Sequence, residues 1–200
     1  KDAVYVDCVI TDPSKVQVSA GSVTVIGTTI YWSGIKNSTR PTLDRVKEAL
    51  FSIIDSYIDE GEILDLFGGT GNLALEAISR GASFAWINDK ESLSISTILS
   101  NVKLTNTGEY VKITKKDYAK CLNQIVKEDK LFDVIFLDPP YKNECLNEII
   151  NKMLEYNLLN KGGIIVCEVD NNYLNKDFKN LEIIKNRKYG DKFIIIYEKN

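Results

Sequence analysis

A glycine-rich turn between an apolar strand and a helix is the feature that most constrains how this chain folds. The apolar run Leu64–Phe67 is followed by Gly68–Gly71, and helical spacing begins at Asn72. Glycine lets the backbone turn tightly and approach a ligand closely, and the amino end of the next helix favours negative groups. The segment therefore predicts a cofactor site at the tip of the first strand of an α/β sheet.

Strand and helix patterns alternate from residue 61 onward. The expected strands are 62–67, 83–88, 110–114, 132–137 and 163–169, and the expected helices are 72–80, 92–104, 118–128 and 144–156. Two final apolar runs, 181–184 and 192–197, flank Arg187–Gly190 and predict a terminal antiparallel pair. This order predicts a doubly wound, mainly parallel α/β sheet, the Rossmann-like architecture.

The first forty residues have a different pattern. Short segments rich in Val, Ile, Thr and Tyr, separated by turn residues, predict small strands or hairpins at 3–10, 15–20, 22–26 and 28–32. A helix is expected over Thr42–Tyr57, with Thr42 as its N-cap. We therefore expect a small β appendage at residues 1–38 and one main domain at 39–200.

Composition excludes several classes of function. The chain has 200 residues with 44% hydrophobic content, enough for one sizeable core, and no run reaches the roughly 18 apolar residues of a membrane span. Four scattered cysteines and no histidine argue against a metal site, exclude His-based catalysis and fit the reducing cytoplasm. The net charge is −3, so a nucleic-acid partner must be held by local basic patches.

The tetrapeptide Asp138–Tyr141, with sequence Asp-Pro-Pro-Tyr, ends the apolar run at 132–137. Proline lacks an N–H and pushes the preceding residue toward extended geometry, so the Asp138 and Pro139 carbonyl groups have few local donors. A carboxylate, exposed carbonyl oxygens and an aromatic ring then meet at a strand tip. This set can accept both hydrogens of an exocyclic amine while Tyr141 stacks on the attached base.

Three further aspartates stand where a nucleoside cofactor would need acceptors. Asp65 lies in the strand before the glycine turn, where it can reach the ammonium group of a bound amino acid. Asp89 ends the second strand, 18 residues after Gly71, and can accept hydrogen bonds from ribose hydroxyls. Asp117 follows the third strand and can receive an adenine amino group.

Five segments together resemble the bacterial 16S ribosomal RNA guanine-N2 methyltransferases, the RsmD family. They are Thr39–Phe51, Leu64–Gly71, Ser79–Ala82, Asp138–Tyr141 and Arg187–Gly190, in this order, and the resemblance covers about residues 37–198. It implies a class I methyltransferase fold, S-adenosyl-L-methionine as methyl donor and N2-methylguanine in small-subunit RNA as product. The implied partner is 16S ribosomal RNA or a small-subunit assembly intermediate, and the implied state is a monomer.

The resemblance assigns roles position by position. The implied catalytic residues are Asp138, Pro139, Pro140 and Tyr141. The implied cofactor-binding residues are Arg40, Asp65, Phe67, Gly68, Gly69, Gly71, Asp89, Lys90, Asp117 and Tyr118.

The amino-terminal segment departs from the family pattern, in which a basic stretch precedes the Thr-Arg-Pro-Thr sequence. Residues 1–38 hold three lysines and three aspartates and are neutral, although phosphate contacts dominate RNA affinity. Basic residues that could contact RNA lie elsewhere, at Lys112, Lys115, Lys116, Lys142, Lys185, Arg187, Lys188 and Lys192.

Other readings remain open from the residues alone. Asp-Pro-Pro-Tyr also suits adenine amines, so an adenine-N6 methyltransferase acting on DNA or RNA is the main alternative. A non-catalytic cofactor- or RNA-binding module is another. The spacing Gly69-x-Gly71-x-x-Ala74 also matches a dinucleotide fingerprint, which leaves an NAD-dependent dehydrogenase as a more distant reading.

Overall fold

The computed structural model describes residues 16–19, 22–25, 28–31, 40–139, 145–169, 174, 177–189 and 192–200. The chain divides into two compact units, Lys1–Ile53 and Ile54–Asn200. The predicted boundary between residues 38 and 39 stays a prediction. No helix in the described ranges is both long enough and apolar enough to cross a membrane.

The first unit contains a three-stranded antiparallel sheet in the order β1-β2-β3. Its strands are β1 (Val16–Ser19), β2 (Ser22–Val25) and β3 (Thr28–Tyr31). The register pairs Val16 with Val25 and Val23 with Ile30. These strands confirm three of the four predicted segments, and the fourth, 3–10, lies outside the described residues.

Helix α1 (Arg40–Ile58) begins two residues earlier than the sequence pattern predicts. Thr42 is therefore inside the helix, and its predicted role as N-cap is wrong. The reason is Pro41, which follows the first helical residue. Proline is well suited to the first turn, because the N–H that it lacks has no partner there.

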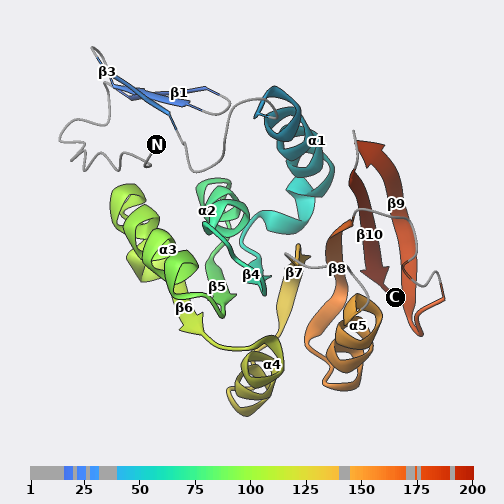
Figure 1. The fold of residues 1–200 in the computed structure, drawn as a ribbon. Helices are drawn as coiled ribbons and strands as arrows, with labels where there is room; N and C mark the ends of the chain where they lie inside the picture. The colour runs from blue at the N-terminus through green and yellow to red at the C-terminus, as the bar shows by residue number, and fades with distance from the viewer. Residues whose placement is uncertain are drawn as a thin grey trace. The chain divides into compact units, whose positions relative to one another are not determined.

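The second unit alternates strands and helices and then ends in a strand pair (Figure 1). Its elements are β4 (Glu62–Asp65), α2 (Asn72–Ser79), β5 (Phe84–Asp89), α3 (Ser92–Thr105), η2 (Gly108–Tyr110), β6 (Val111–Lys115), α4 (Tyr118–Lys127), β7 (Phe132–Leu137), α5 (Leu146–Glu155), β8 (Leu159–Val169), β9 (Leu181–Tyr189) and β10 (Lys192–Lys199).

These strands form a seven-stranded sheet in the order β6-β5-β4-β7-β8-β10-β9. The first five are parallel, and β10 is antiparallel to both β8 and β9. The predicted doubly wound sheet with a terminal antiparallel pair is confirmed. The strand order reverses between β4 and β7, and open sheets of this kind bind ligands at the carboxyl ends of the strands beside that point.

Strand β9 is longer than the predicted apolar run. Arg187 and Lys188, expected in the connection between the last two strands, pair with Ile194 and Phe193 of β10. The prediction followed hydrophobicity and stopped at Ile184. A strand at a sheet edge tolerates charged side chains, because one side of its backbone and much of its surface face solvent.

Helices cover both faces of the sheet. On one face, apolar residues of α4 and α5 join Leu64, Trp86 and Ile135 in one buried cluster. On the other face, α2 and α3 contact β4, β5 and β6. Figure 1 shows α4 and α5 below the strands and α2 on the opposite side. The central strands are thus buried, which leaves the strand ends and the exposed strand β9 for function.

A buried polar network holds three neighbouring strand ends together. The Asn88 Nδ2 group donates to the Leu66 carbonyl oxygen at 3.2 Å and to the Lys116 carbonyl oxygen at 2.9 Å. Asn88 Oδ1 accepts from the Thr114 hydroxyl at 2.8 Å, and that hydroxyl accepts from Trp86 Nε1 at 3.0 Å. Asn88 is 1% exposed. It therefore ties the segments that follow β4 and β6 to the end of β5.

We predict that Asn88→Ala lowers the free energy of unfolding by about 2–3 kcal/mol, because three partners lose their bonds in a dry environment. Urea unfolding followed by circular dichroism measures this. The exposed Asn123 provides a matched control, and Asn123→Ala should change the free energy by less than about 0.5 kcal/mol. Equal midpoints for Asn88→Ala and the unmodified protein would contradict a supporting role for this network.

Candidate functional site

The carboxyl ends of four adjacent parallel strands gather most of the predicted site residues. The glycine turn follows β4, Asp89 ends β5, Asp117 follows β6 and Asp138 follows β7. Because β4 lies between β5 and β7, the turn stands between the acidic strand ends on either side. The fold thus brings these parts of the sequence to one edge of the sheet.

The glycine turn is packed tightly against β5. A Cβ atom on Gly68 would lie 2.4 Å from Ile87 Cγ2, so only glycine fits there, and the Gly68 N–H donates to the Asn88 carbonyl oxygen at 2.8 Å. Gly69 and Gly71 have positive φ angles of 55° and 78°. Gly71 caps α2 without a side-chain hydrogen bond. The first N–H groups of a helix point to its amino end and favour a negative group there, and in α2 the Ala74 N–H donates to Asp65.

Asp65 is a buried acid at the end of β4, 2% exposed. Burial raises its pKa to about 7, and the nearby Asp138 carboxylate adds to this rise. Hydrogen bonds from the backbone N–H groups of Ala74 and Phe67 act in the opposite direction. Two carboxyl groups in a poorly solvated place are stabilised when a cation binds between or beside them.

Asp89 is fixed beside the glycine turn by both of its oxygens. Oδ2 accepts from the Gly69 N–H at 2.9 Å, and Oδ1 accepts from the Glu91 N–H at 2.8 Å. Lys90, also predicted at the cofactor site, is half exposed and its ammonium lies 4.0 Å from the Glu91 carboxylate. The structure thus brings Asp89 to the turn and places Lys90 at the surface.

Asp117 and Tyr118 lie at the start of α4. Asp117 is exposed and caps this helix, since its Oδ1 accepts from the Ala119 N–H at 3.0 Å. The Tyr118 ring faces Phe67 with 6.4 Å between ring centroids and a tilt of 49°. Both rings are partly buried. They form an aromatic border between the glycine turn and the end of β6.

The Asp-Pro-Pro-Tyr segment is described in its first half. Asp138 directly follows β7 and is half-buried, and Pro139 is buried. Pro140 and Tyr141 lie outside the described residues, as does the side chain of Arg40, whose backbone begins α1. Among the residues that the structure describes, no three His, Cys, Asp or Glu side chains are grouped so that they could hold a metal ion.

Three polar residues with structural or electrostatic importance at this edge were missed by the sequence reasoning. Asn88 ties the strand ends together, and Asn101 of α3 donates from Nδ2 to the Thr70 carbonyl oxygen at 2.9 Å, which supports the glycine turn. Glu168 is near the end of β8. Each is a polar residue inside an apolar strand or on a buried helix face, and this signal was present in the sequence.

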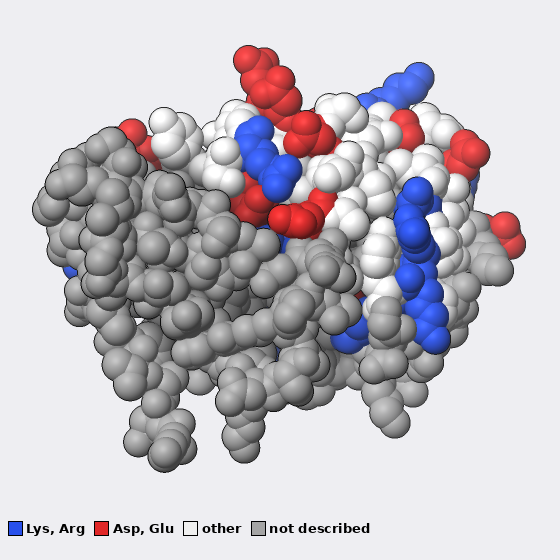
Figure 2. Space-filling view, turned by 90° about the horizontal axis from the view of Figure 1, so that it is seen from above, with Lys and Arg blue, Asp and Glu red and all other residues white. Residues whose placement is uncertain are grey.

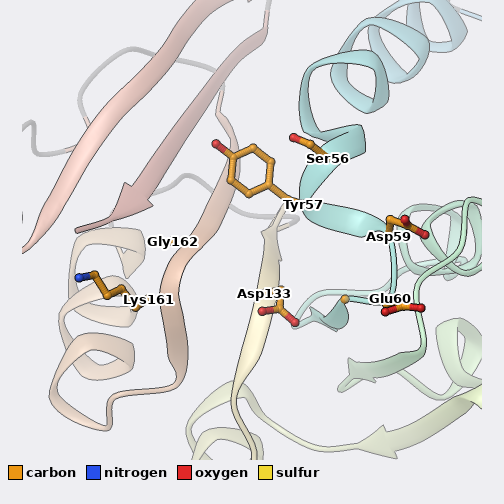
Figure 3. Close-up of a pocket in the computed structure, with 8 residues that line it drawn as sticks. Ser56, Tyr57, Asp59, Glu60, Asp133, Lys161 and Gly162 are labelled. Carbon is orange, nitrogen blue, oxygen red and sulfur yellow. The ribbon is translucent and has the colours of Figure 1, made fainter.

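A hollow of about 350 Å³ opens at the opposite, amino end of the strands (Figure 3). It is lined by Ser56, Tyr57, Asp59, Glu60, Gly61, Asp133, Lys161 and Gly162. Asp133 accepts from the Glu62 N–H at 2.8 Å and from Asn160 Nδ2 at 2.7 Å. Tyr57 donates to Glu198 at 3.1 Å. Asp133 and Tyr57 thus bond to residues around the hollow and hold the chain together, and the hollow lies at the end of the sheet away from the predicted site residues.

Known proteins resemble this chain over most of its length. The family model described as Conserved hypothetical protein 95 matches residues 29–198. The putative rRNA methyltransferase YlbH of Bacillus subtilis is 37% identical over 163 residues, which are 81% of this chain and 89% of that protein. The ribosomal RNA small subunit methyltransferase D of Buchnera aphidicola subsp. Acyrthosiphon pisum is 32% identical over 155 residues, 78% of each protein.

A solved structure agrees with the fold. The conserved hypothetical protein of Streptococcus pyogenes superposes with a TM-score of 0.72 at 32% identity, over 77% of this chain and 95% of that one. The match to the family model, over residues 29–198, includes both the glycine turn and the Asp138 segment. The chain therefore belongs to the Conserved hypothetical protein 95 family, the family of the RsmD-type methyltransferases.

Proposed function

We propose that this protein transfers a methyl group from S-adenosyl-L-methionine to the exocyclic N2 amine of a guanine in 16S ribosomal RNA. The observation that carries the proposal is the placement of Asp138 beside the glycine turn and Asp65, on neighbouring strands. An acceptor for an amine and a site for a cationic nucleoside are thereby adjacent. Relatives named small subunit methyltransferase D support the ribosomal substrate.

The residues at the edge fit S-adenosyl-L-methionine in both charge and shape. The glycine turn and the amino end of α2 suit its carboxylate, and Asp65 suits its ammonium group. Asp89 would accept from the ribose hydroxyls and Asp117 from the adenine amine, while Phe67 and Tyr118 border the adenine ring. The bound cofactor supplies an electrophilic methyl group on a sulfonium centre. The chain's own task is then to place an amine in line with it.

Asp138 and Pro139 would hold the target amine. The Asp138 carboxylate and the Pro139 carbonyl oxygen accept its two hydrogens, which favours tetrahedral character at nitrogen. They also stabilise the positive charge that develops there. Tyr141 would stack on a base swung out of its helix or loop, as enzymes that modify bases require.

Basic side chains along β9 are the best candidates for contact with RNA phosphates. Arg187 and Lys188 are exposed, and their cationic groups lie 5.4 Å and 5.6 Å from the rings of Tyr189 and Phe193. Figure 2 shows a row of Lys and Arg side chains on the side where Figure 1 has β9 and β10. Lys112, by contrast, is already paired with a carboxylate and is a weaker candidate.

We also propose that the protein acts as a monomer in the cytoplasm. Residues 39–200 form the methyltransferase domain, and residues 1–38 form an appendage. The family model begins at residue 29, inside the amino-terminal segment. Light scattering on the purified protein, with and without RNA, measures the oligomeric state.

We predict that Asp138→Ala lowers turnover by about 100-fold or more, because the developing charge on the amine loses its partner. Its affinity for S-adenosyl-L-methionine should stay within about threefold, since the buried Asp65 and the glycine turn remain. The assay offers labelled cofactor with unmethylated small-subunit particles, their naked RNA or duplex DNA, and identifies the methylated nucleoside. Asp55→Ala removes a surface carboxylate and should keep full activity.

N2-methylguanosine from the ribosomal samples supports the proposed reaction, whereas N6-methyladenine would move the enzyme to the alternative base. An Asp138→Ala enzyme that loses cofactor affinity but keeps its turnover per bound complex would falsify the role of Asp138.

We predict that cofactor affinity rises with pH and levels off above pH 7. Asp65 has a raised pKa of about 7, so it is largely protonated below that pH and must ionise to pair with the ammonium group. Affinity should therefore fall by up to about tenfold per pH unit below 7. Calorimetry in two buffers of different ionisation enthalpy gives both the affinity and the proton released.

The variant Asp65→Asn should bind the cofactor weakly and without this pH dependence, whereas Asp55→Asn should keep it. The same group affects stability with a definite sign. Its folded pKa lies above its unfolded value of 3.8, so its contribution to stability is fully present below that value and is lost as pH rises toward 7. A pH-independent affinity in the unmodified protein would contradict the assignment of Asp65.

A further inference from the structure

Glu168 stands next to Asp138 across two parallel strands. In the β7–β8 register Leu137 lies opposite Cys167, so Asp138, which directly follows β7, comes next to Glu168 of β8. Adjacent strands are about 4.8 Å apart, and register partners in a parallel pair point to the same face. Two carboxylates therefore occupy the same face and the same level of the sheet, at the edge that holds the glycine turn.

The contact between Glu168 and Lys192 shows which way the Glu168 side chain leans. Glu168 lies opposite Ile194 of β10, but its carboxylate is 3.5 Å from the ammonium group of Lys192. Because β10 runs antiparallel to β8, Lys192 lies two residues farther toward the carboxyl edge than Ile194. The carboxylate is thus directed along the strand toward that edge. About a quarter of the side chain, 23%, remains exposed to solvent.

Recognition of guanine by the proposed enzyme requires more than one hydrogen-bond acceptor beside Asp138. Guanine presents two neighbouring donors on its Watson–Crick edge, the N1–H and the N2 amine. Adenine presents an amine beside a bare ring nitrogen, which is an acceptor. A second carboxylate next to Asp138 can accept from the guanine N1–H. It repels adenine, because the carboxylate and the bare ring nitrogen are both acceptors and have no proton to share.

We infer that Glu168 selects guanine by accepting a hydrogen bond from its N1–H while Asp138 and Pro139 hold the N2 amine. This inference rests on the proposed function, and it makes Glu168 the residue by which the enzyme distinguishes guanine from other bases. Lys192 keeps the carboxylate in position and compensates part of the repulsion between the two acids. Base flipping brings the Watson–Crick edge of the target within reach of such groups.

The test uses base analogues in a small-subunit RNA. The methylated nucleotide is first mapped with the unmodified enzyme, and RNA is then assembled by ligation with guanosine or 2-aminopurine at that position. 2-Aminopurine keeps the N2 amine but has a bare acceptor at N1. The values of kcat/KM on both substrates are measured for the unmodified enzyme, Glu168→Gln and Glu168→Asp. Glu182→Gln, on the exposed far end of β9, is the matched control.

The unmodified enzyme should prefer guanine over 2-aminopurine by about 10-fold to 100-fold, the range expected for a specific hydrogen-bonded pair. In Glu168→Gln the amide can donate to the bare N1, so the preference should fall by about the same factor, with cofactor affinity unchanged. Glu168→Asp keeps an acceptor and should retain more of the preference. Glu182→Gln should match the unmodified enzyme.

Equal rates of the unmodified enzyme on the two bases would overturn the inference without any variant. A Glu168→Gln enzyme that is slowed equally on both bases would also overturn it, because that result indicates a structural role alone. If the unmodified enzyme forms no N2-methylguanosine at all, the proposed function itself fails. If the enzyme forms N2-methylguanosine and Glu168→Gln keeps the full preference for guanine over 2-aminopurine, only the role of Glu168 is refuted.

Discussion

The candidate site depends on one buried side-chain amide. Asn88 hydrogen-bonds to the backbone after β4 and to the backbone after β6, and so fixes three strand ends at one level. The glycine turn packs on the same strand, with no room for a side chain at Gly68. Asp89 then accepts from the turn itself. A shift of any one strand end would move the N–H groups, the aspartate and the aromatic border together.

Negative charge is concentrated at this edge in a way that favours cationic and hydrogen-bond-donating ligands. Asp65 and Asp138 interact closely enough for one to raise the pKa of the other, and Glu168 follows on the next strand. A folded protein tolerates such a group of acids when ligands offer positive charge or N–H donors. S-adenosyl-L-methionine offers the first and a guanine edge offers the second, so the electrostatics of the edge favour both halves of the proposed reaction.

The two ends of the sheet differ in how their polar groups are satisfied. At the amino end, Asp133 and Tyr57, which line the hollow there, bond to neighbouring backbone and side-chain groups. At the carboxyl end, the N-cap residue of α2 is a glycine, and the buried Asp65 has a raised pKa. This asymmetry follows from parallel strands, which all direct their loops and the starts of the following helices to one edge.

The sequence by itself determined the succession of strands and helices, the glycine turn and the residues Asp65, Asp89 and Asp138, because each is encoded by local hydrophobic spacing or by the backbone chemistry of glycine and proline. It misjudged Thr42, where Pro41 allowed an earlier helix start, and it ended β9 before Arg187, where an edge strand tolerates charge. Only the tertiary structure decided the raised pKa of Asp65, the role of Asn88 and the position of Glu168 beside Asp138. Each of these depends on burial and on strand register between residues far apart in the chain, and no local pattern of residues specifies which strands become neighbours.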